Sequence, residues 1–182
     1  MRPKFERLFY IIILVFVSSA AFSQPFKRLT VDDFQGPPQK GHTADVAFTN
    51  CTIEYSYSAK PMKDYYLLTF NIKLTMNADQ SWMDRSVLAS GSLLAEILKH
   101  EQGHYDISYL EQQELLRTVS HTVFHQDYQR VANNIFDRIE AKYHQLNLDY
   151  DTDTQNSTNR VQQKSWDDYF AKKLEFMPPE GG

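Results

Sequence analysis

Two histidines and a glutamate within residues 100–104 have the types and spacing of a zinc hydrolase site. His100 and His104 are four residues apart, and on a helix such residues share one face with Cβ atoms about 5–6 Å apart. Their imidazoles can therefore bind one zinc ion at about 2.0–2.1 Å each. Glu101 lies about 100° further round the helix, where its carboxylate can reach a water on the ion but is poorly placed as a third ligand.

That position suits a general base. Zinc lowers the pKa of water towards neutrality, and a nearby carboxylate can take the proton as the water attacks a carbonyl, then return it to the leaving amine. We therefore expect Glu101 to be catalytic, His100 and His104 to be metal ligands, Zn²⁺ to be the cofactor, and a peptide or protein to be the substrate.

A helix from about Leu93 to Leu116 is expected to carry this motif, with Ser90 or Ser92 as its N-cap. Residues predicted to point inwards recur at spacings of four and three, and they are Leu93, Ile97, His100, His104 and Ile107. A lone inward histidine is usually a satisfied core residue. Two of them beside a glutamate are better explained by a shared metal.

Other elements follow from periodicity. Alternating side chains predict strands at residues 52–57 and 66–76, joined by a hairpin loop at 58–64 and paired antiparallel. Helices are expected at about 127–145 and 159–176. Their predicted core residues are Tyr128, Val131, Ile135, Ile139 and Leu146 in the first, and Val161, Trp166, Phe170 and Leu174 in the second. Strands followed by helices predict an α+β fold, with a small antiparallel sheet, the long motif helix and two further helices.

The amino-terminal sequence predicts export. Residues 1–23 combine a basic start, an apolar run at 8–17 and small residues before a cleavage point after Ser23, which is the pattern of a secretory signal peptide. The apolar run is too short to span a bilayer of about 30 Å. We expect a single zincin-like domain at 24–177, a disordered tail at 178–182, a secreted or periplasmic location, and no membrane attachment after cleavage.

Composition narrows the possible partners. Without the signal peptide the chain has 16 basic and 22 acidic residues, a formal net charge of −6. An acidic chain without basic clusters is not expected to bind nucleic acid. Cys51 is the single cysteine, so no internal disulfide is possible. The oligomeric state stays open.

The chain resembles a family of secreted bacterial proteins, domain-of-unknown-function 922, which are described as predicted zinc-dependent proteases. The resemblance is carried by Asp33-Phe34-x-Gly36-Pro37, Ser81-Trp82, the segment Leu98 to Ile107, Tyr150-Asp151-x-x-Thr154, and a later Gln and Trp166. It implies a small exported zincin-like domain with proteolytic activity.

The chain departs from the family pattern at one position. Similar sequences tend to read Tyr-Asp-x-x-Thr-x-His, in which the histidine looks like a third zinc ligand, and Asn156 stands there in this chain. A catalytic zinc usually has three protein ligands, and an amide oxygen is a poor substitute for imidazole. Either another residue supplies the third ligand, or the metal site is degraded.

Three acidic residues are candidates for the third ligand. Asp151 and Asp153 flank the substituted position, although a stretch rich in Asp and Thr is more typical of a solvated turn, which is the interpretation we favour. Glu140 follows His104 by 36 residues, but its helical period puts it on the polar side, together with Asn133 and Asp137.

The remaining histidines have simpler explanations. His121, His125 and His144 are expected near helix ends, where they complement the helix dipole or are exposed. Asp106 is about 200° from His104 around the helix and is excluded as a ligand. A calcium loop beginning at Asp149 is also rejected, because Thr154 and Arg160 occupy positions that need Gly and Glu.

Two functions remain after these considerations. The first is an exported zinc metallopeptidase. The alternative is a non-catalytic secreted module with a degenerate metal site and a structural or peptide-binding role, which the substitution at Asn156 suggests. We favour the enzyme, because an unpaired carboxylate such as Glu101 beside two inward histidines is costly unless it has a function.

Overall fold

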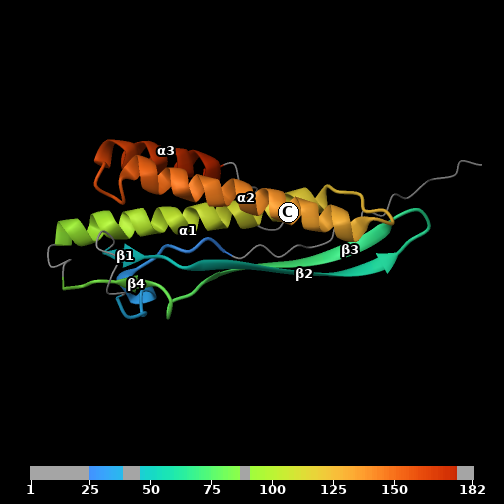
Figure 1. Cartoon of the computed structure of the whole chain (residues 1–182), viewed down its shortest axis with the longest axis horizontal. Coiled ribbons are helices and arrows are strands. Elements are labelled where there is room, and N and C mark those ends of the chain that lie inside the picture. The colour runs from blue at the N-terminus through green and yellow to red at the C-terminus, as the bar shows by residue number, and fades with distance from the viewer. Residues whose placement is uncertain (1–24, 39–45, 87–90, 176–182) are drawn as a thin grey trace, which may run out of the picture.

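The computed structural model describes residues 25–38, 46–86 and 91–175 (Figure 1). Its elements, in chain order, are η1 (Val31–Asp33), β1 (Ala47–Phe48), β2 (Cys51–Pro61), β3 (Tyr66–Met76), β4 (Trp82–Met83), α1 (Gly91–Ser120), α2 (Tyr128–Thr154) and α3 (Arg160–Glu175). The predicted α+β fold is confirmed. The predicted signal peptide and carboxy-terminal tail lie outside the described residues.

The strands form one long ribbon with a break. β2 and β3 pair antiparallel from Cys51 opposite Met76 to Pro61 opposite Tyr66, while β1 pairs with β4. The predicted strand at 66–76 is confirmed. The first strand is longer than predicted, and the loop predicted at 58–64 is wrong, since only residues 62–65 lie between β2 and β3. Pro61 suggests a loop by sequence, yet a proline at the end of an edge strand removes no interior hydrogen bond.

α1 lies between two layers, with the ribbon on one side and α2 and α3 on the other (Figure 1). It is therefore covered on both sides, and its buried residues include His100, Glu101 and Tyr105. The helix was correctly located but begins earlier than predicted, at Gly91. Ser92 thus lies inside the helix and is not its N-cap, and Ser90 lies outside the described residues.

α2 continues nine residues beyond the end predicted at residue 145. Its final segment is rich in Asn, Asp and Thr, which are weak helix formers, so local propensity favoured a turn. Tyr150 and Thr154 are fully buried in this segment, and tertiary packing of this kind supplies most helical stability in proteins. The solvated turn predicted at Asp151 is therefore wrong.

α2 and α3 are joined by a tight turn. Gln155, Asn156 and Ser157 all have positive φ angles, of 49°, 49° and 79°. The amide of Asn156 donates to the carbonyl of Asp151 at 3.1 Å, which ends α2. α3 was predicted within one residue at each end of its described range.

Most of the predicted core is confirmed, including Ile135, Ile139 and Phe170. Leu93 and Val161 are exceptions, since they are 38% and 76% exposed. Both lie in the first turn of a helix, and in Figure 1 the start of α1 projects beyond the ends of α2 and α3. Within the part of the chain that the structure describes, few neighbours lie there to cover the side chain of Leu93.

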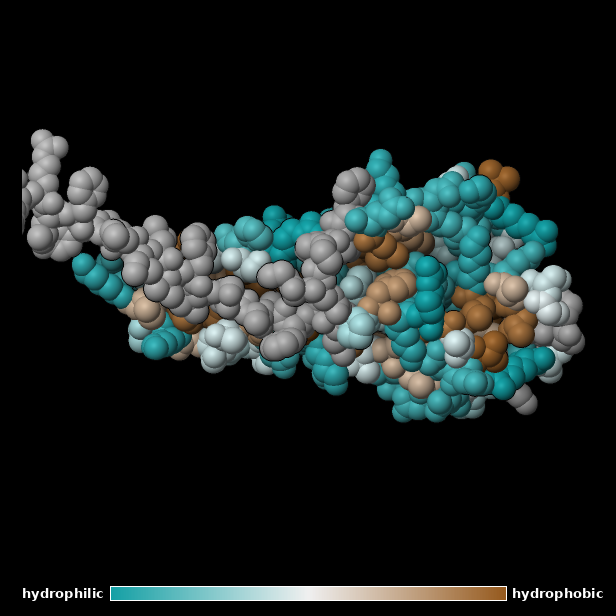
Figure 2. Space-filling view, turned by 180° about the vertical axis from the view of Figure 1, so that it is seen from behind, coloured by the Kyte–Doolittle hydropathy of each residue, from teal (hydrophilic) through white to brown (hydrophobic). Residues whose placement is uncertain are grey.

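Apolar side chains that remain exposed are dispersed. Figure 2 shows small apolar areas separated by hydrophilic ones on the rear face. Among the described residues, the large exposed apolar ones are Phe48, Tyr55, Met62, Tyr65, Leu93, Val123, Leu148 and Val161. Within the described ranges, no helix combines the length and the apolar character needed to cross a bilayer.

Candidate metal centre

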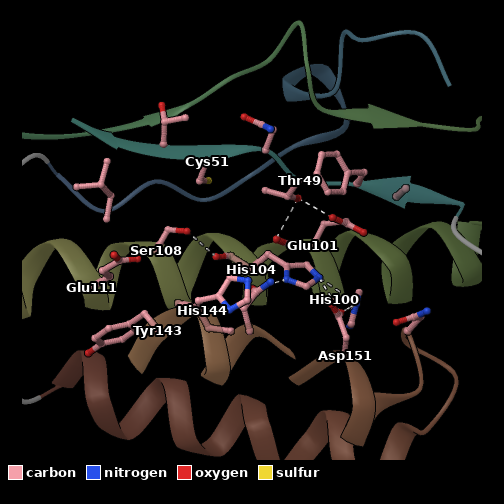
Figure 3. Close-up of a pocket in the computed structure, with 18 of the residues that line it drawn as sticks. Thr49, Cys51, His100, Glu101, His104, Ser108, Glu111, Tyr143, His144 and Asp151 are labelled. Carbon is pink, nitrogen blue, oxygen red and sulfur yellow. Dashed lines mark hydrogen bonds and ion pairs between the residues drawn. The ribbon is translucent and has the colours of Figure 1, made fainter. Parts of the chain in front are cut away.

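Three potential ligand atoms meet where α1 contacts α2 (Figure 3). The Nε2 atoms of His100 and His104 are 3.2 Å apart, and Asp151 Oδ1 lies 3.3 Å from the first and 3.2 Å from the second. A tetrahedral ion with bonds of about 2.0–2.1 Å separates its ligand atoms by about 3.3–3.4 Å. This triangle therefore has the dimensions of one face of a zinc coordination tetrahedron.

The electrostatics of the triangle favour a positive charge. Burial lowers the pKa of His104, but its hydrogen bond to Asp151 and the charges of Glu101 and Asp151 outweigh burial and raise that pKa to about 9. Burial likewise raises the pKa of Asp151, but the two histidines outweigh it and hold that pKa well below its usual range. A proton or a metal ion can supply the cation that these groups favour.

The other nitrogen of each imidazole faces a side-chain amide. Asn147 Oδ1 lies 2.8 Å from His104 Nδ1, and Gln163 Oε1 lies 3.2 Å from His100 Nδ1. An amide oxygen only accepts hydrogen bonds, so each ring donates from Nδ1 and turns Nε2 towards the triangle, where a proton or a metal ion can bind. Metal-binding histidines are oriented by outer partners in the same way.

Gly103 allows α2 to approach α1 closely. A Cβ atom at this position would lie 2.3 Å from the hydroxyl oxygen of Tyr150, which is too close for any side chain. The Tyr150 ring stacks on the His100 ring with a centroid separation of 4.7 Å, and its hydroxyl donates to the His100 carbonyl at 3.0 Å. This contact brings the next residue, Asp151, against the histidines.

α3 and the last residue of α2, Thr154, also hold Tyr150 in place. Gln163 Nε2 donates to the Tyr150 hydroxyl at 2.8 Å, and the Thr154 hydroxyl donates to the Tyr150 carbonyl at 2.6 Å. The indole of Trp166 donates to Asp153 Oδ2 at 3.1 Å. Asp153 therefore faces α3 rather than the triangle, so of the two aspartates considered as a third ligand only Asp151 lies at the histidines.

Glu101 lies on the ribbon side of α1 and is 3% exposed. Its Oε2 accepts a hydrogen bond of 2.6 Å from the hydroxyl of Thr49. The ligand atoms of His100, Glu101 and His104 lie within 4.8 Å of one another, so these three residues form a group that could hold a metal ion. The carboxylate is near enough to the triangle for one water molecule to lie between them.

These residues line one cavity of about 800 Å³ between the β1–β2 segment, α1 and α2 (Figure 3). Pockets of this size are typical of ligand sites. Glu140, His144 and Asn156 also line the cavity, but none of them belongs to the triangle. The thiol of Cys51 lies in the same wall, and burial raises its pKa to about 11.

The other candidate residues are dispersed. His121 and His125 are exposed between α1 and α2. His121 Nδ1 lies 2.8 Å from the Arg117 carbonyl, as expected at a helix end, and His125 Nδ1 lies 3.1 Å from the Asp64 carbonyl. His144 is exposed as predicted but lies within α2, so its assignment to a helix end is wrong. Asp106 accepts a hydrogen bond from Gln102 at 2.8 Å, which fits its exclusion as a ligand.

Sequence reasoning did not identify Thr49 or Asn147. Asn147 precedes Asp151 by four residues, so the spacing places both on one helical face once α2 is known to continue to Thr154. Thr49 has no comparable local signal, because it meets Glu101 only through the folding of the ribbon onto α1.

Comparison with known proteins gives one match. Residues 30–159, more than two thirds of the chain, match the family described as a bacterial protein of unknown function, DUF922. No curated protein and no solved structure matches the chain. The matched range contains the motif helix and the segment from Tyr150 to Thr154. This chain belongs to the DUF922 family.

Proposed function

We propose that the protein is an exported, zinc-dependent peptidase in which His100, His104 and Asp151 hold the metal and Glu101 is the general base. The proposal rests above all on the triangle of Nε2, Nε2 and Oδ1 atoms with sides of 3.2, 3.3 and 3.2 Å. Side-chain triangles of this size and donor type are what a tetrahedral metal requires.

The donor set supports zinc over harder metals. Calcium and magnesium prefer oxygen ligands, whereas two imidazole nitrogens and one carboxylate oxygen suit zinc. Three protein ligands also leave one tetrahedral position open, as in catalytic zinc sites. In this proposal Asp151 is the third zinc ligand, although Asn156 stands where a ligand histidine is expected. The substitution at Asn156 is then no reason to favour a degenerate, non-catalytic site.

The proposed chemistry is amide hydrolysis. Zinc, when bound, supplies Lewis acidity that lowers the pKa of water and polarises a carbonyl group. Glu101 Oε2 is held by Thr49, so Oε1 accepts the proton of the attacking water. Glu101 then gives this proton to the leaving amine nitrogen, and the carboxylate is regenerated as the peptide bond breaks.

Elemental analysis and a turnover assay test this function. The purified chain from residue 24 to 182 should contain about one zinc ion per molecule, and His100→Ala should lose it. With an internally quenched fluorescent peptide library as substrate, Glu101→Gln should retain zinc but lose turnover. Glu54→Gln, on the exposed face of β2, is the matched control and should keep both. Wild-type protein without zinc after reconstitution would contradict the proposal, as would turnover by Glu101→Gln.

A further inference from the structure

We propose that Thr49 is the positioning residue for Glu101, and that Ser81 fixes the backbone from which Thr49 acts. This inference rests on the proposed function, because it assigns a task to Thr49 in the same reaction. It concerns a contact between the ribbon and α1 that the spacing of His100, Glu101 and His104 does not specify.

The contact arises at the break in the ribbon. β1 ends at Phe48 and β2 begins at Cys51, so Thr49 and Asn50 lie outside both ladders. At this point the Thr49 hydroxyl turns towards α1, and it lies 2.6 Å from Glu101 Oε2 and 3.3 Å from the Glu101 carbonyl oxygen (Figure 3). A hydroxyl has one proton to donate, and the shorter distance assigns it to the carboxylate.

The backbone beside Thr49 is held by hydrogen bonds that lie outside the two ladders. The Asn50 amide donates to Ser81 Oγ at 2.9 Å, and Ser81 Oγ donates to the Asn77 carbonyl at 2.8 Å. The Asn77 amide donates to the Asn50 carbonyl at 2.9 Å, and its side-chain amide donates to Asn50 Oδ1 at 2.6 Å. Ser81 is fully buried. Thr49 therefore acts from a fixed position.

A hydroxyl suits this task for two reasons. It restrains a flexible glutamate side chain, and catalytic groups must be held within about 0.5 Å of their productive position. The hydroxyl is also neutral, so it donates a hydrogen bond to Oε2 without cancelling the negative charge that makes the carboxylate a base. The other carboxylate oxygen, Oε1, is the proton acceptor in the proposed reaction.

A merely structural role for Thr49 must be separated from positioning, because a carboxylate that is 3% exposed needs a hydrogen bond for stability alone. Thr49→Val removes the hydroxyl with little change of shape, and Thr49→Ser retains it. Ser81→Ala removes the oxygen that accepts the hydrogen bond of the Asn50 amide. Thr69→Val, at an exposed position of β3, is the matched control.

We expect Thr49→Val to lower kcat about 10-fold to 100-fold, as misplacement of a reacting group does, with KM and zinc content unchanged. Thr49→Ser should restore kcat to near the wild-type value, Ser81→Ala should lower kcat to a smaller extent, and Thr69→Val should have no effect. Crystal structures of the metal-free proteins provide a second readout. The Glu101 carboxylate should shift in Thr49→Val and stay in place in Thr49→Ser.

Unchanged kcat and an unshifted carboxylate in Thr49→Val would overturn the positioning role while leaving the proposed function intact. Loss of zinc from Thr49→Val would also overturn it, since the residue would then support the metal site as a whole. If the wild-type protein shows no turnover that depends on Glu101, the proposed function itself fails. The crystal structures alone then decide whether Thr49 holds the carboxylate.

Discussion

Tyr150 occupies the space that any side chain at Gly103 would need, because a Cβ atom there would lie 2.3 Å from the Tyr150 hydroxyl oxygen and 2.5 Å from its Cζ. The glycine inside the motif and the tyrosine near the end of α2 are thus two halves of one contact. Through this contact Asp151 reaches His100 and His104.

Gly103→Ala should destabilise the fold and weaken zinc binding. Overpacking typically costs about 1–3 kcal/mol, and the gain of about 1 kcal/mol in helix propensity leaves a net loss of up to about 2 kcal/mol. Urea denaturation and zinc titration measure the two effects. Gly91→Ala is the control in the same helix, since nothing lies within 4 Å of a Cβ at Gly91, and it should not destabilise the protein. A Gly103→Ala protein with wild-type stability and zinc affinity would refute the contact.

Tyr150→Phe should lower the free energy of unfolding by about 1–3 kcal/mol, because it leaves buried hydrogen-bonding groups without their partner. The hydroxyl that it removes donates to the His100 carbonyl and accepts from Gln163. Tyr65→Phe, at a residue that is 41% exposed, should have little effect. Equal denaturation midpoints for the two variants would show that the buried hydroxyl contributes nothing.

Asp151→Asn should weaken zinc binding by more than the about 10–100-fold typical of changes to outer partners of a metal site. The substitution replaces the negative carboxylate that pairs with the two histidines by a neutral amide. Asp153→Asn makes the same chemical change two residues further along α2, where the side chain faces Trp166. Isothermal titration with zinc should therefore separate the two variants. Equal affinities for both would exclude Asp151 as a ligand.

Glu111 should make stability depend on pH. Burial, and then the charge of Glu140, raise the pKa of Glu111 from 4.5 to about 7. Between these values the folded protein binds more protons than the unfolded chain, so its stability falls as pH rises from about 5 to 7. In Glu111→Gln, the urea midpoint should no longer show the fall that Glu111 causes between about pH 5 and 7. In Glu140→Gln, this fall should be smaller than in the wild type. Exposed Glu54→Gln should behave like the wild type, and an identical pH profile for Glu111→Gln would contradict the assignment.

The sequence was sufficient for the features that depend on period and spacing. His100 and His104 share a helical face by their spacing alone, and alternation located β3 within its observed bounds. The position of Asp151 could not be obtained in this way. Its segment has weak helix propensity, and only the burial of Tyr150 against Gly103 continues α2 to that point. The contact of Thr49 with Glu101 could not be predicted from local sequence either, because the two residues are 52 positions apart.

The most direct test of the metal site is a crystal structure of the zinc-loaded protein with anomalous data collected at the zinc absorption edge. We predict one strong peak about 2.0–2.1 Å from His100 Nε2, His104 Nε2 and Asp151 Oδ1, with Glu101 outside the coordination sphere. A peak bound by other residues, or no peak between α1 and α2, would contradict the account.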